Sequence, residues 1–217
     1  MAQVHVLREG SLEYVEGSSV IRPATVTLVK YRDFDHHEKY LLVDAGSSCD
    51  TLDDLNDWLK PHNITSKDIH KIILTHNHPD HKALIRHIGS PEGAMIYGPD
   101  YTYCNCYGYE YHVRKSEGYI VPDVMLLDTP GHEGPGDRSV LVNTWEGLVG
   151  IVGDLMFNSE AYKNPESTRK QSPESRKDII SSRNMIINDY PDMVKIIPGH
   201  GPEFNVKDIL KELEIIS

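Results

Sequence analysis

The stretch that decides the fold of this chain is Ile72-Ile73-Leu74-Thr75-His76-Asn77-His78-Pro79-Asp80-His81. Its apolar beginning is typical of a short buried strand, and three imidazoles and one carboxylate follow that strand at once. Clustered titratable groups desolvate one another, and a bound metal is the usual reason for a protein to tolerate them. Residues two apart in extended backbone point the same way, so His76 and His78 can share one ion. Pro79 suits the first turn of a helix, and that turn would present Asp80 and His81.

Four more acidic or imidazole side chains each stand at the end of an apolar stretch, where a strand would carry them to a common edge. They are Asp44 in Val43-Asp44-Ala45-Gly46, His132 in Thr129-Pro130-Gly131-His132, Asp154 in Gly153-Asp154, and His200 in Pro198-Gly199-His200-Gly201. His132, Asp154 or His200 taken alone is better explained as a turn or cap residue. Beside the histidine motif they favour metal binding, because imidazole and carboxylate suit zinc, manganese and iron and the set is large enough for two ions. The chemistry indicated is metal-assisted hydrolysis.

The rest of the chain alternates between the two periodicities of secondary structure. Alternating and β-branched segments separated by glycine and proline predict strands, mainly in the first third and after residue 124. Apolar residues at helical spacing predict a helix over 52–59, another from Pro79 to a cap at Gly89, and a third that Ser172 caps. A polar loop is expected over 158–171. The predicted strands are 4–8, 12–15, 25–31, 39–44, 71–74, 124–127, 139–143, 148–152 and 194–197, and a last helix follows Asn205.

Composition narrows the class of protein. A formal net charge of −11 over 217 residues argues against a broad basic surface for nucleic acid or anionic lipid. No apolar run approaches a membrane span, and the N-terminus lacks the pattern of a signal peptide. The chain has three cysteines, and Cys104 and Cys106 are too close for a comfortable disulfide, which favours reduced thiols. We expect one domain over residues 1–217 with no membrane partner, located in the cytoplasm and, as a second location, in the nucleus.

The combined motifs resemble the metallo-β-lactamase fold superfamily, whose hallmark is His-x-His-x-Asp-His with later His, Asp and His contributions. The resemblance runs from Asp44 to His200. It implies a four-layer αββα sandwich of the α/β (α+β) class, with two sheets face to face and helices outside. It also implies that Asp44 supports the site from behind the ligands. The implied ligands are His76, His78 and His132 for a first ion and Asp80, His81 and His200 for a second, with Asp154 bridging both.

The expected cofactors are two divalent ions, zinc first, with iron or manganese as alternatives. Two ions about 3.5–4 Å apart can hold a hydroxide between them and polarise a scissile carbonyl or phosphoryl group. Asp80 is the predicted catalytic residue, since it could orient that hydroxide and later carry a proton.

An RNA phosphodiester is the first substrate hypothesis. Residues 129–140 and 198–206 resemble a branch of the superfamily to which endoribonuclease action on histone pre-messenger RNA is attributed. Tyrosines between residues 97 and 111, Tyr103 among them, could stack unpaired bases, and Arg169 and Lys170 could meet phosphates. Packing at a sheet edge is a somewhat better explanation for the tyrosines. A solvated face is the alternative for the basic residues, because acidic residues lie between them.

The second hypothesis is a glyoxalase II-like hydrolase of a small thioester, ester or lactone, which the compact chain and acidic charge fit better. An iron-dependent persulfide dioxygenase would use fewer ligands than this complete set. A metal-binding protein without turnover is a further class, and nothing in the ligand set suggests such a loss of activity. The sequence leaves the oligomeric state open, with a homodimer among the alternatives.

Overall fold

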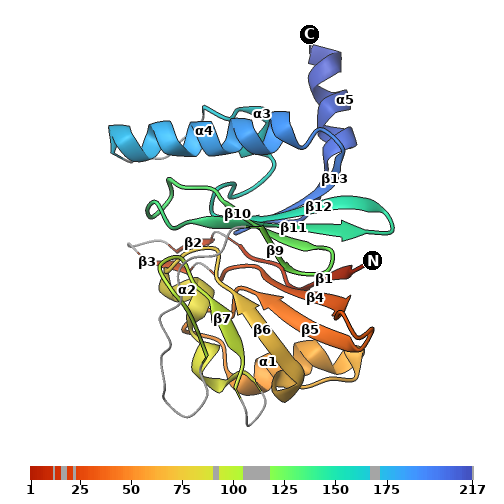
Figure 1. Cartoon of the computed structure of the whole chain (residues 1–217). Helices are drawn as coiled ribbons and strands as arrows, with labels where there is room; N and C mark the ends of the chain where they lie inside the picture. Colours follow the sequence, from red (N-terminus) through yellow and green to blue (C-terminus); the bar gives the residue numbers. More distant parts are fainter. Residues whose placement is uncertain are drawn as a thin grey trace.

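The computed structural model of the chain describes residues 1–11, 13–15, 19–21, 23–89, 93–104, 118–166 and 172–216. Two six-stranded sheets lie face to face (Figure 1). The first has the order β1 (Gln3–Arg8), β4 (Val26–Arg32), β5 (Glu38–Val43), β6 (Ile69–Ile73), β7 (Met95–Tyr97), β8 (Thr102–Cys104). The second has the order β14 (Phe204–Asn205), β13 (Met193–Pro198), β12 (Gly147–Gly153), β11 (Arg138–Thr144), β10 (Val124–Asp128), β9 (Gly118–Val121). In a separate two-stranded sheet, β2 (Glu13–Val15) pairs antiparallel with β3 (Ser19–Ile21).

Helices cover the outer faces of both sheets. The first sheet is flanked by α1 (Leu52–Leu59), α2 (Pro79–Lys82) and the 3-10 turns η1 (Lys60–His62), η2 (Ser66–Asp68) and η3 (Ile85–His87). The second sheet is covered by α3 (Glu160–Lys163), α4 (Pro173–Asp189) and α5 (Val206–Ile216), drawn in blue in Figure 1. The predicted four-layer arrangement is therefore confirmed. Every helix within the described ranges is too short or too polar to cross a membrane.

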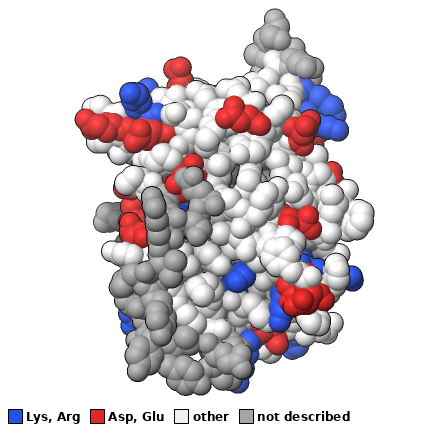
Figure 2. Space-filling view, viewed as in Figure 1, with Lys and Arg blue, Asp and Glu red and all other residues white. Residues whose placement is uncertain are grey.

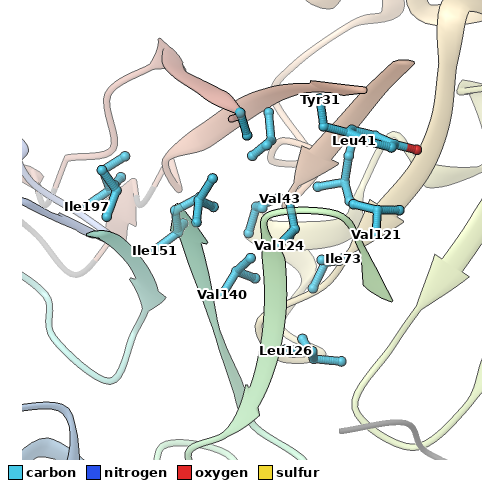
Figure 3. Packing of buried hydrophobic residues seen from close by; sticks show 14 residues of the cluster. Tyr31, Leu41, Val43, Ile73, Val121, Val124, Leu126, Val140, Ile151 and Ile197 are labelled. Carbon is cyan, nitrogen blue, oxygen red and sulfur yellow. The ribbon is translucent and has the colours of Figure 1, made fainter. Parts of the chain in front are cut away.

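Strand alternation divides the core into three clusters. Val43 and Ile73 point between the sheets, where they meet Val140 and Ile151 of the second sheet (Figure 3). Because successive strand residues face opposite sides, their neighbours point the other way. Leu42 and Ile72 pack under α1 against Leu55 and Leu59, and on the opposite side of the molecule Leu141 and Ile196 pack against Ile179 and Ile186 of α4. Burying both faces of each sheet explains the near-continuous apolar runs in these strands.

Parallel pairing brings the ends of four strands to one edge of the sandwich. β5 pairs in parallel with β6 in the first sheet, and β12 pairs in parallel with β13 in the second. The carboxyl ends of parallel strands meet at the same edge, so the residues that follow them are neighbours. Asp44 follows β5, the histidine motif follows β6, Asp154 follows β12 and His200 follows β13.

Two predicted helix boundaries are confirmed by their caps. The side chain of Thr51 accepts a hydrogen bond from the amide of Asp54 at the start of α1, and Asp54 returns one to Thr51. The side chain of Ser172 accepts from the amide of Ser175, with Pro173 in the first turn of α4 as predicted.

Two predictions about local structure are wrong. The helix expected from Pro79 to Gly89 ends at Lys82, and only the short turn η3 follows it. The amides of Ala83 and Leu84 donate instead to the carbonyls of Gly46 and Ala45, each at 3.0 Å, so tertiary bonds replace the helical ones. The loop expected over 158–171 contains α3 in its described part, because Ala161 and Tyr162 are buried against the second sheet, and residues 167–171 lie outside the described residues.

Candidate metal centre

The first half-site consists of His76, His78 and His132, and it lies where the β6–α2 loop meets the β10–β11 turn. Nδ1 of His78 is 3.0 Å from Nε2 of His76 and 3.1 Å from Nε2 of His132. Oδ2 of Asp154 closes the group, at 3.2 Å from Nε2 of His132 and 3.8 Å from Nε2 of His76. Three imidazole nitrogens and one carboxylate oxygen therefore converge on one point.

The second half-site consists of Asp80, His81 and His200. Nε2 of His81 and Nε2 of His200 lie 3.3 Å and 3.1 Å from Oδ1 of Asp154. Oδ2 of Asp80 is 3.5 Å from Nε2 of His200 and 4.0 Å from Nε2 of His81. Asp154 thus presents one carboxylate oxygen to each half-site, which is the arrangement that the bridging role requires.

The distances between these ligand atoms and their lack of hydrogen bonds to described residues both fit metal ions. A tetrahedral ion with bonds of about 2.0–2.1 Å needs its ligand atoms roughly 3.3 Å apart. Nε2 of His81, Nε2 of His200 and Oδ1 of Asp154 are buried and make no hydrogen bond with any described residue. Burying polar atoms in that state costs free energy, and a cation between them would remove the cost. The donor set therefore fits two divalent ions.

The two rings of the second half-site are fixed from behind. Nδ1 of His81 donates to Oδ2 of Asp44 at 2.7 Å, and Thr75 donates to the same carboxylate through its amide at 2.8 Å and its hydroxyl at 2.9 Å. Nδ1 of His200 donates to the carbonyl of Pro23 at 3.2 Å. Each of these bonds puts the ring proton on Nδ1 and leaves Nε2 free to bind a metal. The structure thus places Asp44 in the supporting position that the resemblance implies.

Two glycines allow the ligand loops to approach their neighbours. A Cβ atom on Gly199 would lie 2.1 Å from Oδ1 of Asp154, so only glycine lets the His200 loop reach the bridging carboxylate. Gly131 has φ +137°, and a Cβ atom there would lie 2.5 Å from the amide nitrogen of Ile179 in α4. Ser182 of the same helix donates to the carbonyl of Pro130 at 2.8 Å. The position of His132 is therefore tied to α4.

A hydrogen-bonded latch joins the loops of the first half-site. The amide of Asn77, between His76 and His78, donates to the carboxylate of Glu133 at 2.6 Å, and its side chain donates to Asp100 at 3.0 Å. The amide of Glu133 donates to the carboxylate of Asp137 at 2.7 Å. The sequence patterns gave no indication of a contact between Glu133 and Asn77. Its partner lies 56 residues away, so no local signal could reveal the latch.

The charges of the half-sites differ when no metal is bound. Burial, with the charge of His81, lowers the pKa of His76 well below its ordinary value. Burial also disfavours a charge on His81, but the carboxylates of Asp44 and Asp154 outweigh it and raise the pKa of His81 well above its ordinary value. Burial disfavours the charge on Asp154 too, yet His81 lowers the pKa of Asp154 well below its ordinary value. Without metal, the surroundings of the second half-site therefore favour the charged form of His81, whereas those of the first favour the neutral form of His76.

Phe157 forms an apolar wall across both half-sites. Its ring stacks on His200 with 5.5 Å between centroids and meets His132 edge-on, also at 5.5 Å. Sequence reasoning did not single out this residue. Because it lies only three positions after Asp154, the same strand end delivers the bridging ligand and the wall.

A groove of about 800 Å³ lies beside the first half-site and is lined by Asn77, Pro79 and Glu133 together with Tyr103. The structure therefore brings the predicted substrate residue Tyr103 close to the metal loops. Arg169 and Lys170 lie outside the described residues, and no structural statement about them follows. Described acidic and basic side chains form small interspersed groups on the face drawn in Figure 2.

A third cluster, outside the centre, joins Asp33, Asp35 and His37 at the β4–β5 turn. The Asp33 carboxylate accepts from the amides of Asp35 at 3.0 Å and His37 at 2.9 Å, so a turn explains the cluster.

Comparison with known proteins gives a consistent result for sequence and fold. The family model described as the metallo-beta-lactamase superfamily matches residues 21–200. The chain is 31% identical over 207 residues to metallo-beta-lactamase domain-containing protein 1 of Xenopus laevis, across 94% of this chain and 81% of that protein. It is 29% identical over 151 residues to hydroxyacylglutathione hydrolase of Baumannia cicadellinicola subsp. Homalodisca coagulata, across 67% of this chain but only 53% of that enzyme.

Two solved structures have the same fold. A Thermotoga maritima protein solved as a metallo-beta-lactamase superposes with a TM-score of 0.69 at 16% identity, covering 94% of this chain and 99% of that one. A quorum-quenching N-acyl homoserine lactone lactonase superposes with a TM-score of 0.62 at 18% identity, covering 92% and 91%. From the family model, the Xenopus laevis relative and the fold together, the chain belongs to the metallo-beta-lactamase superfamily, whose members are metal-dependent hydrolases.

Proposed function

We propose that this chain is a dinuclear metal-dependent hydrolase and that it cleaves the phosphodiester bonds of single-stranded RNA. The observation that carries the dinuclear part is Asp154, whose two carboxylate oxygens face different half-sites. Zinc is the first choice of metal, with iron or manganese as alternatives, because all the ligands are imidazole or carboxylate.

The residues of the centre have separate roles in this reaction. When bound, two divalent ions supply Lewis acidity and a nucleophile at neutral pH. His76, His78 and His132 would hold one ion, Asp80, His81 and His200 would hold the other, and Asp154 would contribute one oxygen to each. Asp80 lies at the less buried side of its half-site, with 22% of its side chain exposed, so it can also orient a water and accept its proton. Phe157 keeps bulk water from the rings of His132 and His200.

Two observations support RNA as the substrate. The motifs around His132 and His200 resemble the branch with attributed endoribonuclease action, and the chain is similar over most of its length to metallo-beta-lactamase domain-containing protein 1. Tyr103 lines the groove next to the metal loops, where an unpaired base could stack on it. Such an enzyme would work in the cytoplasm or the nucleus, and microscopy of a fluorescently tagged chain would test that location.

A small ester, thioester or lactone is the second candidate. A groove of about 800 Å³ has the size of a small-molecule site. The net charge of −11 also disfavours a long polyanion. Hydroxyacylglutathione hydrolase is among the sequence relatives, and the second candidate assigns this chain a similar hydrolysis of a small thioester or ester.

The test is a direct measurement of metal content and substrate range. The protein is purified without added metal, its metals are identified and counted, and it is assayed on a single-stranded RNA panel beside S-lactoylglutathione and lactones. We expect two ions per chain and RNA cleavage that disappears in His76→Ala. Cleavage of RNA that persists in this variant would come from a contaminating nuclease and would remove the first candidate. Hydrolysis of the thioester or a lactone alone would establish the second.

A further inference from the structure

The groove beside the first half-site is lined by residues of the loops that carry the metal ligands and by residues of the β7–β8 hairpin. Asn77, Pro79 and Glu133 form its metal side, and these residues are adjacent in sequence to His76, His78 and His132. Tyr101 and Tyr103 line the wall contributed by the β7–β8 hairpin. A substrate whose scissile bond lies at the metals would therefore extend into this groove.

Two cations line the same groove. Lys82 ends α2 and Arg86 belongs to η3, four residues later. Neither side chain forms an ion pair with any described residue. The two acids in the lining, Asp100 and Glu133, already accept hydrogen bonds from Asn77 at 3.0 Å and 2.6 Å. The lining thus contains two carboxylates that are hydrogen-bonded to Asn77 and two cations that form no ion pair with either of them or with another described residue.

The position of these cations depends on the interruption of the helix after Lys82. The amides of Ala83 and Leu84 bond to the β5–α1 loop, so the segment turns away from a regular helix before it reaches Arg86. Leu84 and Ile88 are buried in the core beside α1, which anchors the segment on both sides of Arg86. The backbone that carries both cations is therefore held by the core.

We propose that Lys82 and Arg86 form an anion subsite that binds a phosphate or carboxylate of the substrate next to the scissile group. Tyr101 and Tyr103 line the same groove, so a base or an apolar group of the bound substrate would pack against them. Arg86 suits either anion because its guanidinium can bind two oxygens at once. This inference rests on the proposed function and adds to it a requirement for a negatively charged substrate. It applies to both candidates, because an RNA supplies the anion as a neighbouring phosphate and a glutathione thioester supplies it as a carboxylate.

The experiment measures binding to the metal-free protein, so that it does not depend on turnover. The probes are a 5′-phosphorylated single-stranded tetranucleotide and S-hexylglutathione, titrated against the unaltered chain, Lys82→Gln, Arg86→Gln and the double variant. The matched control is Lys67→Gln, an exposed cation of η2 that does not line the groove. Lys82→Arg, which keeps the charge, should retain binding, and circular dichroism verifies that each variant folds.

We expect each single variant to bind an anionic probe roughly five- to tenfold more weakly, because a charged hydrogen bond in a half-exposed groove is lost. The double variant should lose roughly the product of the two, and Lys67→Gln should lose nothing. In the metal-loaded enzyme the same changes should raise KM for anionic substrates much more than they lower kcat.

The probe that responds identifies the anion. Weaker binding of the tetranucleotide alone indicates phosphate, and weaker binding of S-hexylglutathione alone indicates carboxylate. Equal binding by the double variant and the unaltered chain would overturn the subsite, as would the absence of measurable binding of either probe to the unaltered chain. If the unaltered chain binds a probe through Lys82 and Arg86 but, when loaded with metal, hydrolyses neither RNA nor the thioester, the proposed function is wrong and the subsite stands.

Discussion

The two half-sites use the same kinds of ligand but are held in different ways. The rings of His81 and His200 are completely buried, and each is hydrogen-bonded from behind, to the Asp44 carboxylate and the Pro23 carbonyl. In the first half-site 11% of the His132 side chain is exposed and His78 is half-buried. An exposed latch through Glu133 joins their loops, and α4 holds the His132 loop as well, through the bond from Ser182 to Pro130.

The difference shows two routes to a preorganised ligand set. Buried hydrogen bonds to Asp44 and Pro23 fix the second half-site. They require charged groups to leave water, so folding depends on pairing those groups with hydrogen-bond partners. An exposed latch fixes the first half-site with bonds that compete with water and contribute little to the stability of the fold. Changes in the supports should therefore affect metal binding and stability together, whereas changes in the latch should affect mainly metal binding.

The largest effect is expected for Asp154→Ala, which removes the carboxylate whose two oxygens face different half-sites. We expect metal content to fall from two ions to one and kcat to fall by well over about 100-fold, more than the loss of a supporting residue costs. Elemental analysis and initial rates measure both quantities. Full activity with one bound ion would contradict the bridging role.

The next largest effect is expected for Asp44→Asn. The Thr75 amide and the His81 ring donate to different oxygens of the Asp44 carboxylate. An amide has only one acceptor oxygen, so its NH2 group would face one of these two donors. Metal affinity of the second half-site should fall by roughly 10- to 100-fold. The free energy of unfolding of the metal-free protein should fall by about 1–3 kcal/mol, because a buried polar group is left unsatisfied. An unchanged urea midpoint would argue that the supports serve metal binding only.

The pH dependence of metal binding should separate the half-sites. The pKa of His81 is raised in the metal-free protein, so metal must displace its proton, and the affinity of the second half-site should rise by up to about tenfold per pH unit until that pKa is passed. The pKa of His76 is lowered, so this residue imposes no such slope on the first half-site at neutral pH. The measurement is chelator competition with His132→Ala and His200→Ala, which isolate the second and first half-sites. Equal slopes of metal affinity against pH at the two half-sites would show that the charge on His81 does not distinguish them.

The linked effect on stability has the opposite sign. A group whose pKa is raised by folding stabilises the protein below its unfolded pKa, and the contribution is lost as the pH rises through the folded value. Urea unfolding of the metal-free protein should therefore show stability falling as the pH increases above about 6.5, the unperturbed histidine pKa. Asp44→Asn should weaken that dependence, because it removes one of the two carboxylates that raise the pKa of His81.

The smallest effect is expected for Glu133→Ala, which breaks the latch at the Asn77 amide. Because Glu133 is exposed, water replaces part of the lost bond, and we expect metal affinity at the first half-site to fall by roughly three- to tenfold with little change in stability. Glu133→Gln keeps an acceptor oxygen and should restore most of the affinity. The visible spectrum of the cobalt-substituted protein would report the geometry of this half-site. A spectrum unchanged in Glu133→Ala would exclude the latch as a positioning device.

The fold and the grouping of the candidate ligands could be predicted from the sequence, because local patterns indicated the strand ends and the resemblance implied the sandwich. Each ligand follows an apolar strand, and the caps at Thr51 and Ser172 are local hydrogen bonds with recognisable residues. The helix break after Lys82 could not be predicted, because its cause is a pair of bonds to Ala45 and Gly46 some forty residues earlier. The same limit hid the latch through Glu133 and the groove, which form only when distant loops meet.

The contact between Gly131 and α4 has a consequence for control of the enzyme from outside its cleft. The His132 loop lies directly against the backbone of this helix and is hydrogen-bonded to it through Ser182, so a small tilt of the helix would carry an imidazole with it. A displacement of about 1 Å at a reacting centre can cost on the order of 100-fold in rate. A compound that settled on the outer surface of α4 would thus act as a noncompetitive inhibitor, lowering the maximal velocity while leaving substrate affinity intact.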